Sequence, residues 1–252
     1  MFIFIIKLNN LIFLFYKINL LYFNILRNNI LKNMKMLYIN LFVLVLFNYC
    51  LSELDPELKV GEVYQLPEPD KESGMPLNEA LNKRKTSRDF DPSTKLTPEL
   101  LSQALWSCYG ENRPKGYKTT PSAVAWYPLM VYVFLEEGVF KYDAQTHSVT
   151  KVLDGDYREY CGSQTAVVTK ARANFMFIAD FKKKSSMDDD EEHKLRSIYL
   201  DTGHSTMALS LFAASNNMKG VVREMVDPEP LLELLQLEKD DYIFTLSFSL
   251  GF

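Results

Sequence analysis

Three cations and a hydroxyl group stand close together in the segment KRKTSRDF, residues 83–90. They are Arg84, Lys85, Thr86 and Arg88. The guanidinium fork of arginine matches phosphate oxygens, lysine adds a point charge, and a threonine hydroxyl adds one more donor. The segment therefore predicts a phosphate-binding site. Cations are also favoured at the C-terminus of a helix by the helix dipole, and spacing alone leaves both interpretations open.

A second group of candidates follows about thirty residues later. Trp126 and Tyr127 could stack on a planar ligand or simply pack in the core. Lys118 lies in a loop rich in Gly, Pro and Lys, where it could meet an anionic substrate or remain solvated. These residues are candidate contacts of a planar cofactor or a substrate, and the residue types alone leave plain packing or solvation equally open.

Several familiar motifs are missing from the chain. Neither G-x-G-x-x-G nor G-x-x-x-x-G-K-[ST] occurs, which argues against a Rossmann dinucleotide site and against an ATP phosphate loop. Neither G-x-S-x-G nor H-E-x-x-H occurs, so the serine and zinc hydrolase classes lose their usual support. The three histidines share no ligand spacing and no C-x-x-C is present, so we expect no metal site.

Charge is divided unevenly along the chain. Residues 1–52 carry five basic residues and no acidic one, which leaves 23 basic and 32 acidic residues in 53–252, a net charge of −9. A protein that neutralises phosphates needs a basic face. The composition of 53–252 therefore argues against a nucleic-acid partner.

The N-terminal 52 residues differ from the rest. Residues 1–33 use only eight residue types, and we interpret them as translated upstream sequence, because Lys and Asn interrupt each apolar run before it could span a membrane. Residues 34–52 have the layout of a signal peptide: a basic start, an apolar run and a possible cut before Glu53. An uncleaved anchor is the alternative. The sequence thus predicts a protein that is secreted or associated with a membrane through this segment.

The elements that must position the candidates can be predicted in outline. Residues 53–75 read as an extended, solvated lead-in, and 76–252 as one α+β domain. Capping and apolar patterns predict helices near 77–83, 98–110, 191–216 and 229–237. Apolar β-formers predict strands near 129–135, 139–142, 174–181, 220–222 and 242–250. The long helix is apolar on nearly every side, which places it centrally or at a subunit interface.

The segment KRKTSRDF resembles the R-[RHK]-S-x-[RK]-x-F signature of the nitroreductase family, which holds FMN. Further stretches resemble that family in the same order, from Pro76 to Gly251: KLTPELLSQALWSCYGENRPKG, TTPSAVAWYPLMVYVF, EGVFKYDAQTHSVTKV, LDTGHSTMALSLFAAS and GVVREMVD. They are most similar to an exported subgroup related to the dehydrogenases that oxidise azoline rings in peptides. The resemblance implies a mostly antiparallel central sheet flanked by helices, with the long helix at a homodimer interface.

The resemblance also implies roles for individual residues. Arg84 and Thr86 would hold the FMN phosphate and ribityl chain, Lys85 would contribute partly through its backbone, and Arg88 would lie near N1 and O2 of the flavin ring. Negative charge appears at that edge on reduction, and a fixed cation stabilises it. The ring would be lined from the partner subunit by Pro121, Ser122 and Ala123. Along its N5 edge the matching residues are Val222, Arg223, Glu224 and Met225.

The implied activity is transfer of hydride from NAD(P)H to a small conjugated acceptor, nitroaromatic or quinone-like, in a ping-pong cycle. Two departures from the family pattern bear on it. Glu224 replaces a glycine of the exported subgroup, and the chain stops at SLGF without the basic pair that many members place near the phosphate. A non-catalytic flavin- or ligand-binding dimer and a peptide azoline dehydrogenase are the alternatives.

Overall fold

The computed structural model describes residues 58–72, 74–187 and 190–252. The predicted upstream segment, the signal or anchor segment and the start of the lead-in lie outside these residues. Among the helices described, none combines the length and the apolar character needed to cross a bilayer.

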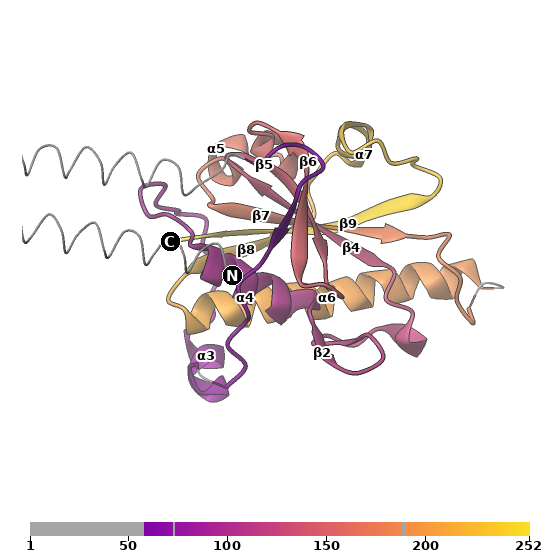
Figure 1. The fold of residues 1–252 in the computed structure, drawn as a ribbon, viewed down its shortest axis with the longest axis horizontal. Coiled ribbons are helices and arrows are strands. Elements are labelled where there is room, and N and C mark those ends of the chain that lie inside the picture. The colour runs from indigo at the N-terminus through magenta and orange to yellow at the C-terminus, as the bar shows by residue number, and fades with distance from the viewer. Residues whose placement is uncertain (1–57, 73, 188–189) are drawn as a thin grey trace, which may run out of the picture. The chain divides into compact units, whose positions relative to one another are not determined.

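An antiparallel sheet forms the centre of the described fold (Figure 1). Its strand order is β1-β6-β5-β4-β7-β9-β8, and every neighbouring pair is antiparallel. The strands are β1 (Val63–Gln65), β4 (Leu129–Leu135), β5 (Gly138–Asp143), β6 (Ser148–Asp154), β7 (Ala173–Asp180), β8 (Lys219–Arg223) and β9 (Tyr242–Gly251). A small ribbon of β2 (Glu111–Arg113) and β3 (Tyr117–Lys118) stands apart from it. The predicted α+β class with a mostly antiparallel sheet is confirmed.

Helices cover both faces of the sheet (Figure 1). They are α3 (Leu77–Lys83), α4 (Pro98–Tyr109), α5 (Thr165–Val168), α6 (Glu191–Ser215) and α7 (Pro228–Leu234), with 3-10 turns η1 (Ala123–Ala125) and η2 (Arg158–Cys161). The predicted signals for α4 are confirmed, since the Thr97 hydroxyl accepts from the Leu100 amide (3.3 Å) and the helix ends at Gly110.

The central strands are buried on both faces, which explains their continuous apolar runs. Val133 and Phe177 belong to the core that contains residues of α4 and α6. Their neighbours Phe134 and Ile178 point the other way, into a core that includes Leu231 of α7. Successive side chains of a strand alternate between the faces, so β4 and β7 join the two cores.

The structure corrects the expected lead-in. Residues 63–65 form β1, which pairs with β6, and Leu66 is only 3% exposed in the core. Val63 and Tyr64 are β-formers, so this stretch joins the sheet as its edge strand, while the side chains of β1 stay exposed. The charged run 182–194 also contributes to the fold, because residues from Glu191 belong to α6 and Lys194 is buried.

The long helix α6 has two unequal faces. Its buried face carries Ile198, Leu209 and Phe212 together with small hydroxyl side chains such as Thr202 and Ser205. Four large apolar side chains instead point to solvent: Leu195, Tyr199, Leu200 and Met207. They recur at helical spacing and form a stripe, which we call the α6 stripe.

Candidate functional site

The predicted phosphate-binding segment leaves α3 and runs beside β8. Arg84 is the C-cap of α3, and its amide donates to the Ala80 carbonyl (2.9 Å). Thr86 bridges to Gly220, and the Ser87 amide donates to the Gly220 carbonyl (3.0 Å). Lys83 is the basic residue of the last helical turn, so Lys85 and Arg88 lie beyond the helix. Their positions favour the phosphate interpretation over cations that merely offset the helix dipole.

The end of β8 carries the second predicted group. Val222 is 41% exposed, Met225 is 75% exposed, and Glu224 is exposed, whereas Arg223 is buried. The alternation of a strand therefore presents Val222 and Glu224 on an open surface while it turns the Arg223 guanidinium inward. The pairing of Thr86 with Gly220 brings the two predicted groups to one edge of the sheet.

Arg223 holds a buried positive charge that lacks a carboxylate among its hydrogen-bond partners in the described residues. Its terminal nitrogens donate to the Gln164 side-chain oxygen (3.1 and 3.3 Å), and its buried Nε has no partner there. Burial, followed by the nearby charge of Arg88, holds the pKa of Arg223 below its usual range. A buried cation without a counter-ion is costly. The Arg88–Arg223 pair therefore fits an anionic ligand group.

A second cluster lies around η1 and is held by α6. The Asp201 carboxylate accepts from the Ser122 hydroxyl (2.5 Å) and from the Ala123 amide (3.2 Å). The Ser122 oxygen in turn accepts from the Tyr127 amide (2.8 Å). Asp201 is 4% exposed, and burial raises the pKa of its carboxyl group. One buried acid thus fixes the segment that follows Pro121.

The backbone of this segment is strained. Val124, Ala125 and Tyr127 have φ angles of +47°, +54° and +49°. L-residues rarely adopt such angles, and for the β-branched Val124 the cost is largest. Strain of this kind persists only where surrounding contacts enforce it, and it clusters at ligand sites. The Asp201 network and a hydrogen bond from Lys183 to the Tyr127 carbonyl (2.8 Å) supply those contacts.

Lys118 and Tyr127, both predicted to meet a substrate, line one cavity of about 400 Å³. The Lys118 Nζ lies 4.6 Å from the Tyr109 ring centroid and 5.7 Å from that of Tyr127. Burial lowers the pKa of Lys118. A cation held against two aromatic rings suits a planar ligand that carries negative charge. Lys141 and Lys183 also line this cavity.

Trp126 does not join this cavity. Its side chain is 5% exposed within the core, and its Nε1 donates to the Lys183 carbonyl (2.9 Å). Lys194 covers its ring at 5.1 Å. This placement favours the packing role that the sequence left open for Trp126.

The two clusters lie at different positions along α6. Asp201 holds Ser122, whereas Ala213, twelve residues later, packs near Gly220. With a rise of 1.5 Å per residue, about 18 Å of helix separates these contacts. The residues predicted to line the flavin ring are therefore not gathered around Arg84 and Arg88 within one subunit.

Sequence reasoning did not single out Asp201 or Gln164. An acid in the middle of the apolar stretch IYLDTGHS is a signal that could have identified Asp201, because a buried carboxylate needs hydrogen-bond donors. No comparable signal marks Gln164, whose role depends on the buried position of Arg223.

Comparisons with known proteins bear on the family and the fold. The model of the nitroreductase family matches residues 81–252. A protein of Methanocaldococcus jannaschii, provisionally named a nitroreductase, is 28% identical over 189 residues, which cover 71% of this chain and 93% of the relative. The crystal structure of a provisionally named nitroreductase of Ralstonia eutropha is 31% identical, with a TM-score of 0.69 over 78% of this chain and 93% of its own.

A more distant structure shares the fold. It is the FMN complex of a provisionally named nitroreductase of Desulfovibrio desulfuricans, 14% identical, with a TM-score of 0.52 over 71% of this chain and 87% of its own.

Proposed function

The chain belongs to the nitroreductase family, and from that premise we propose that it is an oxidoreductase that binds FMN and passes hydride from NAD(P)H to a small conjugated acceptor. Bound FMN supplies the redox chemistry, accepting two electrons and passing them on. The single observation that carries the proposal is the buried Arg223 beside Arg88, a positive site without a carboxylate partner among the described residues.

Residues of β8 and of the segment beside it would hold different parts of FMN. Arg84 and Thr86 face the phosphate and ribityl chain, and the backbone of Lys85 contributes beside them. Arg88, with Arg223 behind it, provides the positive charge for the ring edge that becomes negative on reduction. Val222, Glu224 and Met225 are exposed and provide the surface along the other ring edge.

The proposal includes a homodimer that completes the site. In one subunit about 18 Å of α6 separates the Asp201 contact with Ser122 from the Ala213 contact near Gly220. A second copy packed on the α6 stripe would bring Pro121, Ser122 and Ala123 of the partner subunit to the flavin ring. The exposed apolar side chains of α6 support this arrangement.

The acceptor class follows from the cavity at Lys118. Tyr109 and Tyr127 offer ring surfaces and Lys118 a desolvated cation, which suits nitroaromatic or quinone-like molecules. NAD(P)H and the acceptor occupy the open face in turn, because no dinucleotide-binding fingerprint provides a separate site. Initial rates should therefore give parallel double-reciprocal lines, and intersecting lines would contradict the ping-pong scheme.

The first test is the colour of the purified protein. A flavin absorption band that bleaches on addition of NADPH supports the enzyme. A colourless protein that does not bind added FMN supports the non-catalytic alternative. Glu224 favours that alternative, because its exposed negative charge lies beside the proposed ring site. A peptide azoline dehydrogenase would instead require a modified peptide as substrate.

The second test separates Arg84 from Arg88. Arg84→Ala should weaken FMN binding about tenfold to a hundredfold, because loss of a charge-assisted hydrogen bond costs roughly 1.5–3 kcal/mol. The phosphate charge is the same in both redox states, so the reduction potential of bound FMN should stay near the wild-type value. Arg88→Ala should lower that potential, because its charge stabilises the reduced form most. Normal binding and potential in both variants would contradict these roles.

Export remains part of the proposal. Mass spectrometry of the native protein should find a mature N-terminus near Glu53, and a mature peptide that contains Phe13 or Phe23 would contradict it.

A further inference from the structure

The cavity at Lys118 holds an ammonium group whose hydrogen-bond donors are not used by the described residues. The Lys118 Nζ lies over the Tyr109 ring, 4.6 Å from its centroid, and it forms neither an ion pair nor a hydrogen bond with the described part of the chain. The Tyr109 hydroxyl accepts from the Leu129 amide (3.1 Å), which fixes the ring beneath the cation. An ammonium group has three N–H donors, so a ligand in this cavity can use them.

The acids near Lys118 do not neutralise it by direct contact. Asp143 is the only acid among the described residues that line the cavity. Its side chain is exposed, and its Oδ1 accepts from the Gln145 amide (2.9 Å) in the adjoining turn. Glu111 lies opposite Lys118 in the β2–β3 ribbon, yet no ion pair joins the two side chains in the described structure.

A second ammonium group faces the same cavity. Lys183 lines it and donates to the Tyr127 carbonyl (2.8 Å), which also belongs to a lining residue. Burial lowers the pKa of Lys118, Glu111 partly opposes this shift, and the positive charge of Lys183 adds to it. Two like charges near one partly buried space repel each other, and a bound anion would offset that repulsion.

The rest of the cavity offers aromatic and aliphatic surface. The Tyr127 ring centroid lies 5.7 Å from the Lys118 Nζ, and this ring meets the Tyr109 ring edge to face. Leu129 and Val131 of β4 also line the cavity. Its volume of about 400 Å³ lies in the range of small-molecule sites. A ligand with one substituted aromatic ring therefore suits it in both size and polarity.

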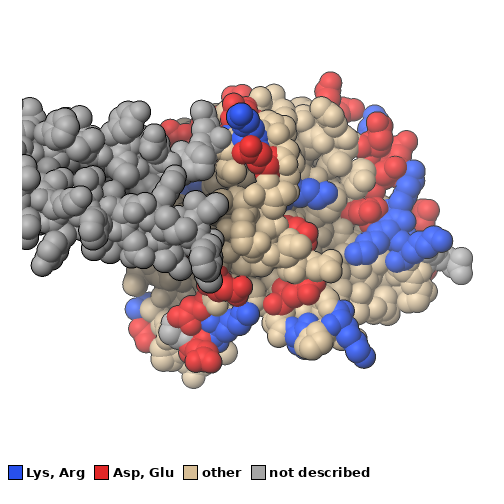
Figure 2. Space-filling model, viewed as in Figure 1, with Lys and Arg blue, Asp and Glu red and all other residues tan. Residues whose placement is uncertain are grey.

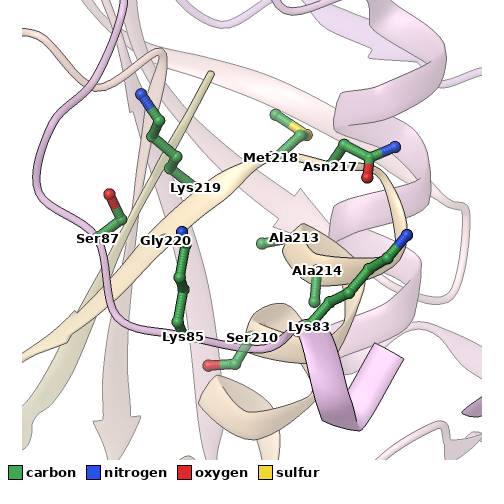
Figure 3. Close-up of a pocket in the computed structure, with 10 residues that line it drawn as sticks. All are labelled: Lys83, Lys85, Ser87, Ser210, Ala213, Ala214, Asn217, Met218, Lys219 and Gly220. Atoms are coloured by element: carbon green, nitrogen blue, oxygen red, sulfur yellow. The ribbon is translucent and has the colours of Figure 1, made fainter. Parts of the chain in front are cut away.

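The hollow between α3, α6 and β8 offers a contrast (Figure 3). Its three lysines, Lys83, Lys85 and Lys219, point apart. The Lys83 ammonium pairs with Glu79 on the surface of α3, and the Lys219 ammonium donates to the Asp89 carbonyl. No group of donors converges there, whereas Lys118 directs an unused ammonium group at a surface that an aromatic ring can cover.

We propose that the ligand of the Lys118 cavity is an aromatic carboxylate, with its carboxylate on the Lys118 ammonium and its ring against Tyr127. This inference rests on the proposed function, because it names the charge class of the acceptor. A neutral ligand would bury the ammonium group without a counter-ion, which is unfavourable. A phosphate dianion would need more converging donors than one unused ammonium group supplies, so a carboxylate is the better match.

Calorimetric titration with benzoate, benzamide and acetate tests this ligand class without turnover. Benzamide has the shape of benzoate without its charge, and acetate has the charge without the ring. Benzoate should bind about tenfold or more tightly than either, because each of the other probes loses one of the two contacts. Benzamide or acetate that binds as tightly as benzoate would overturn the proposal, as would no benzoate binding at millimolar concentration.

A variant of Lys118 places the binding in this cavity. Lys118→Gln should weaken benzoate binding about tenfold and should remove most of the preference for benzoate over benzamide. Lys115→Gln is the matched control, since Lys115 is exposed in the turn of the same ribbon and does not line the cavity. An unchanged preference in Lys118→Gln, or the same loss in Lys115→Gln, would overturn the proposal.

Turnover separates this inference from the proposed function. With NADPH as donor, the ratio of kcat/KM for 4-nitrobenzoate to that for 4-nitrobenzamide should fall about tenfold in Lys118→Gln. Turnover of both acceptors with the same ratio in wild type and variant would support the proposed function and overturn the ligand class. Benzoate binding that depends on Lys118 in a protein without turnover would support the ligand class and contradict the proposed function.

Discussion

At the scale of single residues, two buried charges shape the site. Arg223 is buried behind the candidate flavin surface, and the Gln164 side-chain oxygen is its hydrogen-bond acceptor. Asp201 has a structural role instead, because its carboxylate accepts hydrogen bonds from the Ser122 hydroxyl and the Ala123 amide. A buried charge without a counter-ion is unfavourable. An anionic ligand would therefore compensate the charge of Arg223. Asp201 is a positioning residue, because its contacts are with the chain.

The Asp201 network makes a testable unit. Asp201→Ala leaves two donors without an acceptor, at a cost of roughly 1–3 kcal/mol, which is partly offset because burial disfavours the carboxylate. Ser122→Ala removes the same contact from the other side. The two losses in the free energy of unfolding should therefore couple by about 0.5–3 kcal/mol in a double-mutant cycle measured with urea.

The matched control is Ser215→Ala at the far end of α6, about 21 Å from Asp201 along the helix. Its effect should add to that of Asp201→Ala without coupling. Strict additivity of the Asp201 and Ser122 effects would show that the hydrogen bond does not hold the strained segment.

The cationic cluster can be recognised from residue types alone, because Arg84, Lys85 and Arg88 stand close together in an acidic chain. The structure places Arg84 at the C-cap of α3, with Lys85 and Arg88 beyond the helix. The burial of Arg223 depends on the register of β8 against β9, and burial of Trp126 depends on the turn at η1. Neither follows from residue type, because both side chains are as common at a ligand as in a packed interior.

At the scale of elements, the sequence predicts the long apolar strands and the long helix. The strands at 129–135 and 174–181 and the helix from 191 fall within one residue of the observed bounds. The residue pattern does not predict β6, since Thr150, Lys151 and Asp154 interrupt its apolar run. Lys151 is nevertheless buried, with Asp154 as its ion partner and the Phe140 ring nearby. Pairing with β5, not composition, makes this strand.

The interspersed acidic and basic side chains on the face drawn in Figure 2 agree with such local pairing. The pairs Lys83–Glu79 and Lys239–Glu229 join two exposed side chains and contribute little to stability. Lys151, Arg158 and Arg172 are instead largely buried, and each pairs with a more exposed acid.

Hydrogen bonds of His147 hold the lead-in against the rest of the fold. His147 in the turn before β6 contacts the Pro67 carbonyl (3.1 Å) and Ser102 (2.7 Å) through Nε2, and the Tyr142 hydroxyl (2.9 Å) through Nδ1. A neutral ring with its proton on Nε2 satisfies these contacts. Burial, partly opposed by the Pro67 contact, lowers the pKa of His147.

This arrangement predicts a pH dependence. The pKa of an unfolded histidine is about 6.5, so below that pH the unfolded chain takes up the proton more readily than the folded one. The contribution of His147 to stability is thus present above about pH 6.5 and is lost as pH falls toward its folded pKa. Urea unfolding between pH 7.5 and 5.5 should show this slope. His147→Gln should reduce it, and His193→Gln, at the exposed start of α6, should not.

At the scale of the whole molecule, one subunit presents a divided site. The proposed flavin edge lies at β8, and the strained segment is held by Asp201 further back along α6. The α6 stripe faces solvent on the part of the helix around Asp201. Burial of apolar surface contributes about 25 cal/mol per Å², so four large side chains on one helix face form a substantial driving force for association. Association and cofactor binding should therefore be linked, because each completes the other.

Leu200→Glu tests that linkage. Leu200 is 60% exposed on the α6 stripe, so a charge there should cost little in an isolated subunit but should disrupt a buried interface. Sedimentation should show a dimer for the wild type and a monomer for the variant, and the variant should lose FMN although Arg84 and Arg88 are intact. Val60→Glu is the control, since Val60 is 57% exposed in the lead-in and away from α6. A Leu200→Glu variant that stays dimeric would place the interface elsewhere, and a monomer that retains FMN would show that one subunit holds the whole cofactor site.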